Sequence, residues 1–288
     1  MKHIPVLLDA VKQAIGDMHG LRIADCTFGA GGYSRAFLDA GANVVAFDRD
    51  PNVADDAMAF QEKYGCAFRF VPETFSHIGE IDGLFDVIVF DLGISSMQID
   101  VAERGFSFRA DAPLDMRMSS CGMTATALIE KSSADELSQI LREFGDVKKA
   151  NVIARALKEK LPKTTFELRD LIYNPNDIAP VFQALRIAVN DEFGELRRAL
   201  SAVPGKLAPG GKCICVTFHS IEDRIVKDTF RMWTTPAGDA RLPVVQPAPF
   251  KLIKPVTPND DELKNNPRAH SAHMRGVIKV LTDTREFM

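Results

Sequence analysis

The chain has 288 residues, 46% of them hydrophobic and 26% charged, and a net charge of −4, so it can form one large domain or two smaller ones around a sizeable core. Its five cysteines are odd in number and form no C-x-x-C pair, which argues against a disulfide framework and against a zinc site. The N-terminus lacks the layout of a signal peptide and no apolar run approaches membrane-spanning length, so we expect a soluble, cytoplasmic protein without a membrane partner.

The first elements are a helix, a strand, a glycine turn and a second helix. Apolar residues at helical spacing predict a helix over 6–15. An apolar run at 21–24 then leads through Asp25 into a turn that holds Gly29, Gly31 and Gly32, and residues 34–40 are predicted to be helical. Glycine tolerates a positive φ and carries no side chain, so such a turn brings bare backbone close to a ligand.

The same alternation continues as far as residue 91. Strands are predicted over 42–47, 66–71 and 83–90, and a helix runs from Pro51 to about residue 63. Strands that alternate with helices indicate an α/β fold with a parallel, doubly wound sheet. Ligands of such sheets bind beyond the carboxyl ends of the strands, where the glycine turn, Asp48, Phe75 and Asp91 are expected to lie.

A helical segment then interrupts the α/β pattern. Residues 92–122 are irregular, and helices are predicted over 125–131, 134–144 and 150–160 with no strand between them. We therefore predict a helical domain at 111–181, suited to substrate recognition, inserted into a domain formed by 1–110 and 182–288. The second part of that domain is predicted to hold the following elements: a long helix (181–200), a strand (213–218), a helix (222–233), a loop (234–250) and a last strand (275–281).

The glycine turn fits a dinucleotide-binding fingerprint only in part. From Gly29 it is G-A-G-G-Y-S, so Ser34 stands where G-x-G-x-x-G requires its third glycine. Sites for S-adenosylmethionine (SAM) use the same strand, turn and helix with looser glycine spacing, and Asp48 would accept hydrogen bonds from both ribose hydroxyls. SAM is the favoured ligand, NAD(P) stays open, and a structural turn without a cofactor is the third interpretation.

The segment after the fourth strand, Asp91-Leu-Gly-Ile-Ser-Ser96, is expected where a transferred group would be held. Methyl transfer to an exocyclic amine needs the nucleophile, the methyl carbon and the leaving sulfur in line. Acceptors that hold the amine hydrogens orient its lone pair, so Asp91, Ser95 and Ser96 are the catalytic candidates. For Asp91, a helix N-cap is the structural alternative.

Cations and aromatic residues alternate between positions 104 and 117. Such a pattern suits single-stranded nucleic acid, because aromatic rings stack on bases, arginines neutralise phosphates, and a carboxylate accepts from a cytosine amino group. Burial of the rings in a core and pairing of the arginines with local acids explain the pattern equally well. The substrate-binding candidates, which include a histidine at the end of the fifth predicted strand, are Phe106, Phe108, Asp115, Arg117 and His219.

Charge is distributed unevenly along the chain. Residues 1–100 hold 7 Lys and Arg against 15 Asp and Glu, and the remainder holds 28 against 24. A basic remainder suits a polyanionic partner, and the cations at 148–160 would follow RNA phosphates, although ordinary surface variation accounts for both observations. His270 and His273 have no carboxylate or thiol partners at metal-ligand spacing, so no metal site is expected.

Segments in nearly the whole chain resemble, in the same order, the bacterial RsmH (MraW) family of SAM-dependent N4-cytosine methyltransferases of small-subunit rRNA. The matching segments are 3–8, 25–34, 47–51, 91–96, 103–108, 113–118, 182–190, 207–212, 218–227 and 266–268. The resemblance implies a class I SAM-methyltransferase (Rossmann-like) sheet with an inserted helical domain, and transfer of a methyl group from SAM to the N4 amino group of a cytidine in 16S rRNA. It also implies SAM contacts at Gly31, Gly32, Tyr33, Asp48, Phe75, Asp91 and Gln98.

The partner that the resemblance implies is small-subunit rRNA or the assembling small ribosomal subunit, and a homodimer is left open. Two departures stand out: Tyr33 lies where relatives usually have His, and an Arg that usually precedes Phe182 is missing. Two alternatives of other classes remain. One is an NAD(P)-dependent oxidoreductase, and the other is a non-catalytic RNA-binding factor on the same fold.

Overall fold

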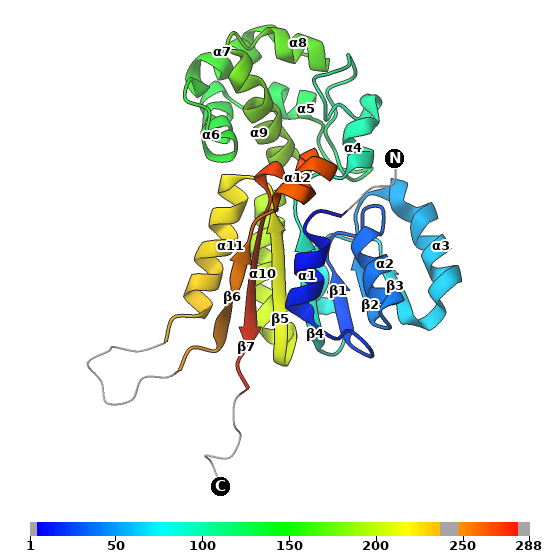
Figure 1. Ribbon diagram of the computed structural model, residues 1–288. Helices are drawn as coiled ribbons and strands as arrows, with labels where there is room; N and C mark the ends of the chain where they lie inside the picture. The colour runs from blue at the N-terminus through cyan, green and yellow to red at the C-terminus, as the bar shows by residue number, and fades with distance from the viewer. Residues whose placement is uncertain (1–4, 237–246, 282–288) are drawn as a thin grey trace, which may run out of the picture. The chain divides into compact units, whose positions relative to one another are not determined.

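A computed structural model describes residues 5–236 and 247–281 and divides the chain into two compact units (Figure 1). One unit consists of Met1–Gly93 and Glu195–Met288, and the other of Ile94–Gly194. The helical unit is thus larger than the expected domain at 111–181. It begins earlier because the irregular segment after residue 94 packs into its core.

The larger unit is built on one seven-stranded sheet, with strand order β3-β2-β1-β4-β5-β7-β6. The strands are β1 (Arg22–Asp25), β2 (Asn43–Phe47), β3 (Phe68–Val71), β4 (Phe85–Asp91), β5 (Leu207–Thr217), β6 (Phe250–Val256) and β7 (His273–Lys279). Strands β1 to β5 are parallel where they pair, whereas β7 is antiparallel to both β5 and β6. The parallel sheet predicted from the alternation up to residue 91 is therefore confirmed, and β6 and β7 add an antiparallel edge to it.

Helices flank this sheet and fill its core. They are α1 (Leu8–Ile15), α2 (Gly32–Asp39), α3 (Ala54–Tyr64), α10 (Glu192–Lys206), α11 (Ser220–Trp233) and α12 (Asp260–Asn265). Apolar residues of α10 and α11, such as Leu200 and Phe230, pack with Ile88 and Phe90 of β4 in one buried cluster. Residues 87–90 of β4, Val-Ile-Val-Phe, are all buried, and such a continuous apolar run is typical of a parallel strand that is covered on both faces.

Strand β6 and helix α12 were not predicted. The strand contains Lys251, Lys254 and Pro255, all exposed, and only Phe250 is fully buried. Charged residues and proline protect an open sheet edge, but they also hide the strand from a search for alternating apolar residues. Part of the predicted loop, at 237–246, lies outside the described residues.

The smaller unit is helical. Its helices are α4 (Ser96–Asp100), α5 (Ala125–Lys131), α6 (Ala134–Gly145), α7 (Ala150–Lys160), α8 (Thr165–Asp170) and α9 (Ile178–Asn190). Buried leucines of α6 and α7 form its core with Phe182 and Leu185 of α9 and with Leu114 and Met116 from the irregular segment. Helix α6 begins with a capping box, in which Ser133 and Glu136 each bond the other's backbone N–H.

The prediction of a single helix over 181–200 is wrong. Asp191 ends α9 in a left-handed conformation with φ 48°, and α10 starts at the next residue. The break has no proline or glycine to mark it, because aspartate tolerates this conformation better than most residues.

Candidate active site

The glycine turn connects β1 to α2. Gly29 and Gly31 have φ values of 51° and 71°, which favour glycine. A side chain at Gly31 would overlap the Phe60 ring, and one at Gly32 would overlap Pro5. Packing within the protein therefore requires glycine at positions 31 and 32, whether or not a ligand approaches the turn.

Asp25, at the end of β1, is completely buried beneath this turn. Its carboxylate accepts a 2.6 Å hydrogen bond from the Ser34 hydroxyl and one from the Thr27 N–H at 3.2 Å. Burial outweighs these bonds and raises the pKa of Asp25 to about 6. Ser34, which takes the third glycine position of the dinucleotide fingerprint, is therefore a buried partner of Asp25.

Asp25→Asn is expected to remove a pH dependence of stability between pH 4 and pH 6. Since the folded pKa of about 6 exceeds the ordinary 3.8, this group favours folding most below pH 4, and the benefit is lost as pH rises to about 6. The difference amounts to about 3 kcal/mol. Urea unfolding of both proteins across this range measures it, with exposed Asp55→Asn as the charge control; parallel pH profiles for wild type and Asp25→Asn would contradict the prediction.

Asp48 follows β2 and is fixed by the glycine turn. Its Oδ2 accepts from the Gly29 N–H at 2.8 Å and its Oδ1 from the Asp50 N–H at 2.9 Å. Burial raises the pKa of Asp48, against the effect of these hydrogen bonds. Each carboxylate oxygen has a second lone pair, so the group can still accept two hydroxyl donors.

Asp91 ends β4, and Asp25 ends the neighbouring strand β1 at the same edge of the sheet, in register with Val89 of β4. Its backbone N–H donates to the Thr27 hydroxyl at 2.8 Å, while its side-chain Oδ1 is buried and has no hydrogen-bond partner among the described residues. Burial, followed by the charges of Asp25 and Glu222, raises the pKa of Asp91 well above its usual range. An unpaired buried acceptor is costly, so it marks a place where a ligand can donate.

Tyr33 and Phe75 lie in the same unit. The Tyr33 ring is buried, with its centroid 5.8 Å from that of Phe37, and its hydroxyl donates to the Val6 carbonyl. Phe75 follows β3 and meets the Phe90 ring edge-on at 5.5 Å, with part of its side chain exposed. Phe75 therefore has an accessible surface at the sheet edge, whereas the Tyr33 side chain is occupied by the protein itself.

Ser95 and Gln98 form the capping box of α4 in the helical unit. The Ser95 hydroxyl accepts from the Gln98 N–H at 3.2 Å, and the Gln98 side chain accepts from the Ser95 N–H at 3.1 Å. The Ser95 hydroxyl thus has a structural role, and it is Ser95 rather than Asp91 that caps this helix. Ser96 is the first residue of α4, and its side chain lies outside the described part of the chain.

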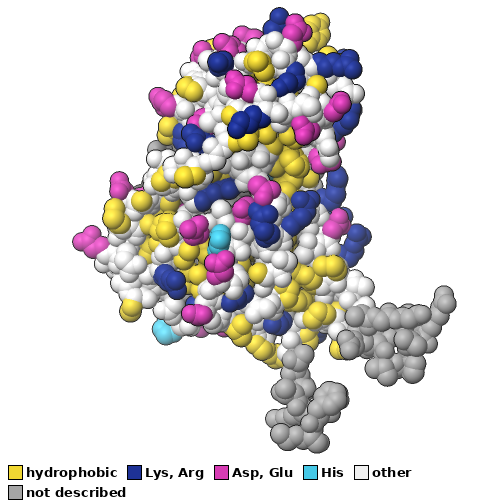
Figure 2. All heavy atoms as spheres, turned by 180° about the vertical axis from the view of Figure 1, so that it is seen from behind, with side chains coloured by type: hydrophobic (Ala, Val, Ile, Leu, Met, Phe, Trp, Pro, Cys, Tyr) yellow, Lys and Arg dark blue, Asp and Glu magenta, His cyan; other side chains and the backbone are white. Residues whose placement is uncertain are grey.

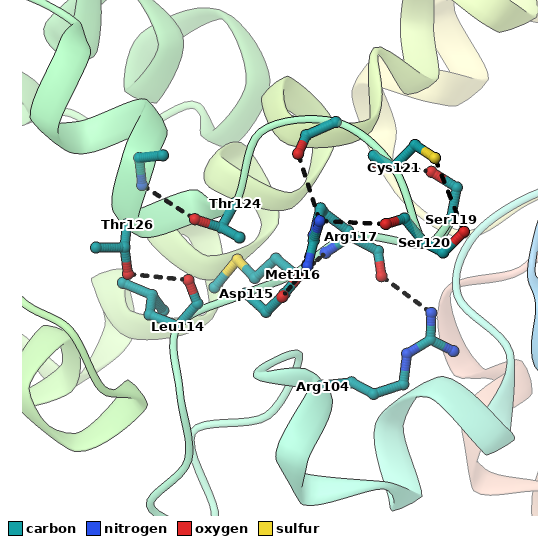
Figure 3. Close-up of polar contacts among 12 residues, drawn as sticks. Arg104, Leu114, Asp115, Met116, Arg117, Ser119, Ser120, Cys121, Thr124 and Thr126 are labelled. Carbon is teal, nitrogen blue, oxygen red and sulfur yellow. Dashed lines mark hydrogen bonds and ion pairs between the residues drawn. The ribbon is translucent and has the colours of Figure 1, made fainter.

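Asp115 and Arg117 form an ion pair within the helical unit (Figure 3). The guanidinium donates to both carboxylate oxygens at 2.8 and 2.7 Å and reaches the Ser120 carbonyl at 3.3 Å. Hydrogen bonding to Arg117 lowers the pKa of Asp115. The ion pair therefore stabilises the loop that contains both residues. Each side chain is still 28% exposed, so polar atoms of the pair remain accessible to solvent.

The aromatic candidates belong to the core of that unit. Phe106 is 7% exposed in the buried cluster, and the Arg104 guanidinium lies over its ring, 5.3 Å from the centroid. The structure thus places Phe106 in the core, the structural interpretation of this pattern, and its role as a base-stacking platform stays a prediction. Phe108 is partly buried and meets Phe182 edge-on at 5.4 Å, so only part of its ring remains accessible.

His219 precedes α11 and acts as its N-cap, because its Nδ1 accepts from the Glu222 N–H at 3.4 Å. Its Nε2 lies 3.5 Å from Oε1 of Glu222, a residue that is only 4% exposed. Glu222 also accepts from the Phe218 N–H at 2.8 Å. The histidine therefore has a structural task at the end of β5.

The sequence model of the MraW methylase family matches residues 1–280. The chain belongs to this family. A relative from Chelativorans sp. (strain BNC1), "Ribosomal RNA small subunit methyltransferase H", is 45% identical over 96% of this chain and 86% of its own length. A relative of the same name from Bartonella bacilliformis is 41% identical over 99% of this chain and 92% of its own length.

Membership of the MraW methylase family makes the chain a SAM-dependent methyltransferase with a class I α/β fold. The alternative of an NAD(P)-dependent oxidoreductase is thereby overturned. An rRNA methylase structure from Streptococcus thermophilus is 10% identical over 97% of this chain and 99% of its own length, with a TM-score of 0.44.

Two residues that position the site of this MraW methylase were missed in the sequence. Thr27 holds the backbone of Asp91, and Glu222 contributes a third buried carboxyl group near it. Thr27 lies within the glycine segment, but nothing in its neighbours indicates a bond to a residue so distant in the chain. Glu222 stands at a predicted helix start, where an acid is ordinary.

The described residues contain no helix that is both long and apolar enough to cross a membrane. Within 5–236 and 247–281, no three His, Cys, Asp or Glu side chains gather as a metal ion would require.

Proposed function

We propose that this methyltransferase moves a methyl group from SAM to the N4 amino group of a cytidine in small-subunit (16S) rRNA. The family match and the names of the relatives support the substrate class. The observation that carries the chemistry is the buried Oδ1 of Asp91, which has no hydrogen-bond partner among the described residues.

The residues at the sheet edge fit the parts of SAM. Asp48 keeps lone pairs for both ribose hydroxyls, since its two backbone bonds occupy one position on each oxygen. The backbone of Gly31 and Gly32 would hold the methionine portion, and the accessible surface of Phe75 would pack against adenine. We keep Tyr33 and Gln98 as proposed contacts through backbone atoms, because their side chains already bond the protein.

SAM supplies an electrophilic methyl group on a positively charged sulfur. The chain has to orient the amine and receive its proton. Asp91 Oδ1 would accept a hydrogen of the N4 amine, which directs the nitrogen lone pair toward the methyl carbon. As the N–C bond forms and the C–S bond breaks, the nitrogen becomes more acidic, and a carboxylate with a raised pKa is suited to take its proton. We assign Ser95 and Ser96 a supporting role through the backbone of their segment.

RNA contacts are proposed at Phe108, Asp115, Arg117 and His219. The exposed edge of the Asp115–Arg117 pair suits base recognition, with the pair opening to present the carboxylate. On the face shown in Figure 2, Lys and Arg side chains are interspersed with Asp and Glu. This face therefore offers no single basic field to an RNA. We place the reaction in the cytoplasm, on free rRNA or the assembling subunit, and leave a homodimer open.

Ligand binding and methyl transfer test this function separately. SAM at a hundredfold excess over its Kd should stabilise the protein by about 2.7 kcal/mol, and NAD should not. Radiolabelled methyl from SAM should enter small-subunit rRNA taken from a strain that lacks this enzyme, with naked rRNA and subunits compared side by side. SAM binding without transfer to either substrate would favour the non-catalytic RNA-binding factor, and stabilisation by NAD alone would overturn the cofactor assignment.

A further inference from the structure

The segment Pro5–Leu7, which we call the N-terminal strap, makes two contacts with the end of the glycine turn and the start of α2, and a third with α12. The Tyr33 hydroxyl donates to the carbonyl of Val6. The Pro5 ring fills the space that a Cβ of Gly32 would need. The Leu7 N–H donates to the carboxylate of Glu262, a residue of α12.

The strap is ordered at an energetic cost. Leu7 has φ 55°, a left-handed conformation that disfavours a leucine by about 1–2 kcal/mol. Its side chain and that of Val6 are both buried. Asn259 caps α12 by accepting from the Glu262 N–H at 2.8 Å, which fixes the turn that carries this carboxylate. Such strain persists only where surrounding contacts determine it.

The strap also lies near the carboxyl groups of the proposed cofactor site. Burial raises the pKa of Tyr33 well above its usual value, and the nearby charges that add to this effect belong to Asp91, Asp25 and Glu262. The geometry agrees, because Tyr33 precedes Ser34, whose hydroxyl donates to Asp25 at the end of β1. Tyr33 stays a neutral donor there at any physiological pH.

We propose that Tyr33 and Glu262 are positioning residues for SAM, which hold the N-terminal strap as one wall of the cofactor site. This inference rests on the proposed use of SAM at the glycine turn. Neither side chain needs to touch SAM, because both act through the backbone of the strap. The strap in turn keeps the Gly31–Gly32 backbone in place through Pro5.

The test is SAM binding by calorimetry on single variants of the full chain. Tyr33→Phe keeps the ring and removes the bond to Val6, and Glu262→Ala removes the acceptor of the Leu7 N–H. Each variant is expected to raise the Kd for SAM about five- to tenfold, while kcat at saturating SAM stays within about twofold. Glu262→Gln retains an acceptor oxygen and should restore binding to within about twofold of wild type.

Two variants in the same unit serve as matched controls. Tyr64→Phe removes a hydroxyl that donates to Asp39 at the surface, and Asp261→Asn neutralises a carboxylate that is 87% exposed on α12. Neither should change the Kd for SAM. A Kd within about twofold of wild type in both Tyr33→Phe and Glu262→Ala would overturn the inference.

Hydrogen exchange gives a second readout, which is measured on the wild-type protein and does not depend on the folding of any variant. SAM should slow exchange of the Leu7 amide, whose proton is bound by Glu262, if the strap is part of the site. Unchanged exchange at Leu7 in the presence of saturating SAM would also overturn the inference. Failure of the wild type to bind SAM at all would instead overturn the proposed function.

Discussion

Asp91→Asn is expected to lower kcat for methyl transfer about 100- to 1,000-fold while the protein keeps or gains stability. The variant retains an acceptor oxygen for the N4 amine but has no group that can take its proton. It also removes a carboxyl group whose pKa is raised by burial and by Asp25 and Glu222, so folding no longer carries that cost above neutral pH.

The measurement compares single-turnover transfer, the Kd for SAM and thermal unfolding in wild type, Asp91→Asn and Asp91→Ala. Asp86→Asn is the matched control, since Asp86 lies at the other end of β4 and accepts from the Arg22 N–H at 2.8 Å. A loss of SAM affinity equal to the loss of transfer would reduce Asp91 to a cofactor contact. Full transfer in Asp91→Asn would exclude the proton-accepting role.

Asp48→Ala is expected to raise the Kd for SAM by roughly 30- to 1,000-fold. Two hydrogen bonds from ribose hydroxyls to a charged acceptor are worth about 2–4 kcal/mol together. The substitution also frees the Gly29 N–H, which the carboxylate holds at 2.8 Å, so the turn itself becomes less ordered. Transfer at saturating SAM should be reduced far less than affinity.

Calorimetric titration with SAM checks this expectation. Asp86→Ala provides the comparison, because it removes a carboxylate that also accepts a backbone N–H in the same sheet, but at the amino end of β4. It should lower stability without changing SAM affinity. An unchanged Kd in Asp48→Ala would remove the ribose role, and an equal change in Asp86→Ala would attribute the effect to general destabilisation.

The sheet as far as β4 was predictable because β1, β2 and β4 contain short apolar runs that lead directly to an aspartate at the ligand edge. The confirmed positions of Asp25, Asp48 and Asp91 at strand ends follow from that pattern alone. The last strands were not predictable in the same way. β6 is exposed and contains lysines, so it lacks the apolar pattern of a strand. No local pattern specifies that it pairs antiparallel with β7.

Sequence patterns also fail to predict the long-range contacts of the candidate site. A carboxyl group can be placed at a strand end from sequence, but its hydrogen-bond partners are distant in the chain. Asp91 depends on Thr27, and Tyr33 on Val6. Phe106 could not be assigned to core or surface, because its neighbours alternate cation and ring in either case. The burial of Phe106 depends on its contacts within the core of the helical unit, which the sequence does not show.

The position of the helical unit between β4 and β5 has a consequence during protein synthesis. These two strands are adjacent and parallel in the sheet, yet residues 92–206, which include the helical unit, separate them in the sequence. At about 5–20 residues per second, translation must continue for several seconds or more after β4 is complete before β5 is available. During that interval the nascent half-sheet exposes the backbone of β4 as an unpaired edge, which is open to wrong pairing or chaperone capture, while the helical unit can already fold from its own local contacts.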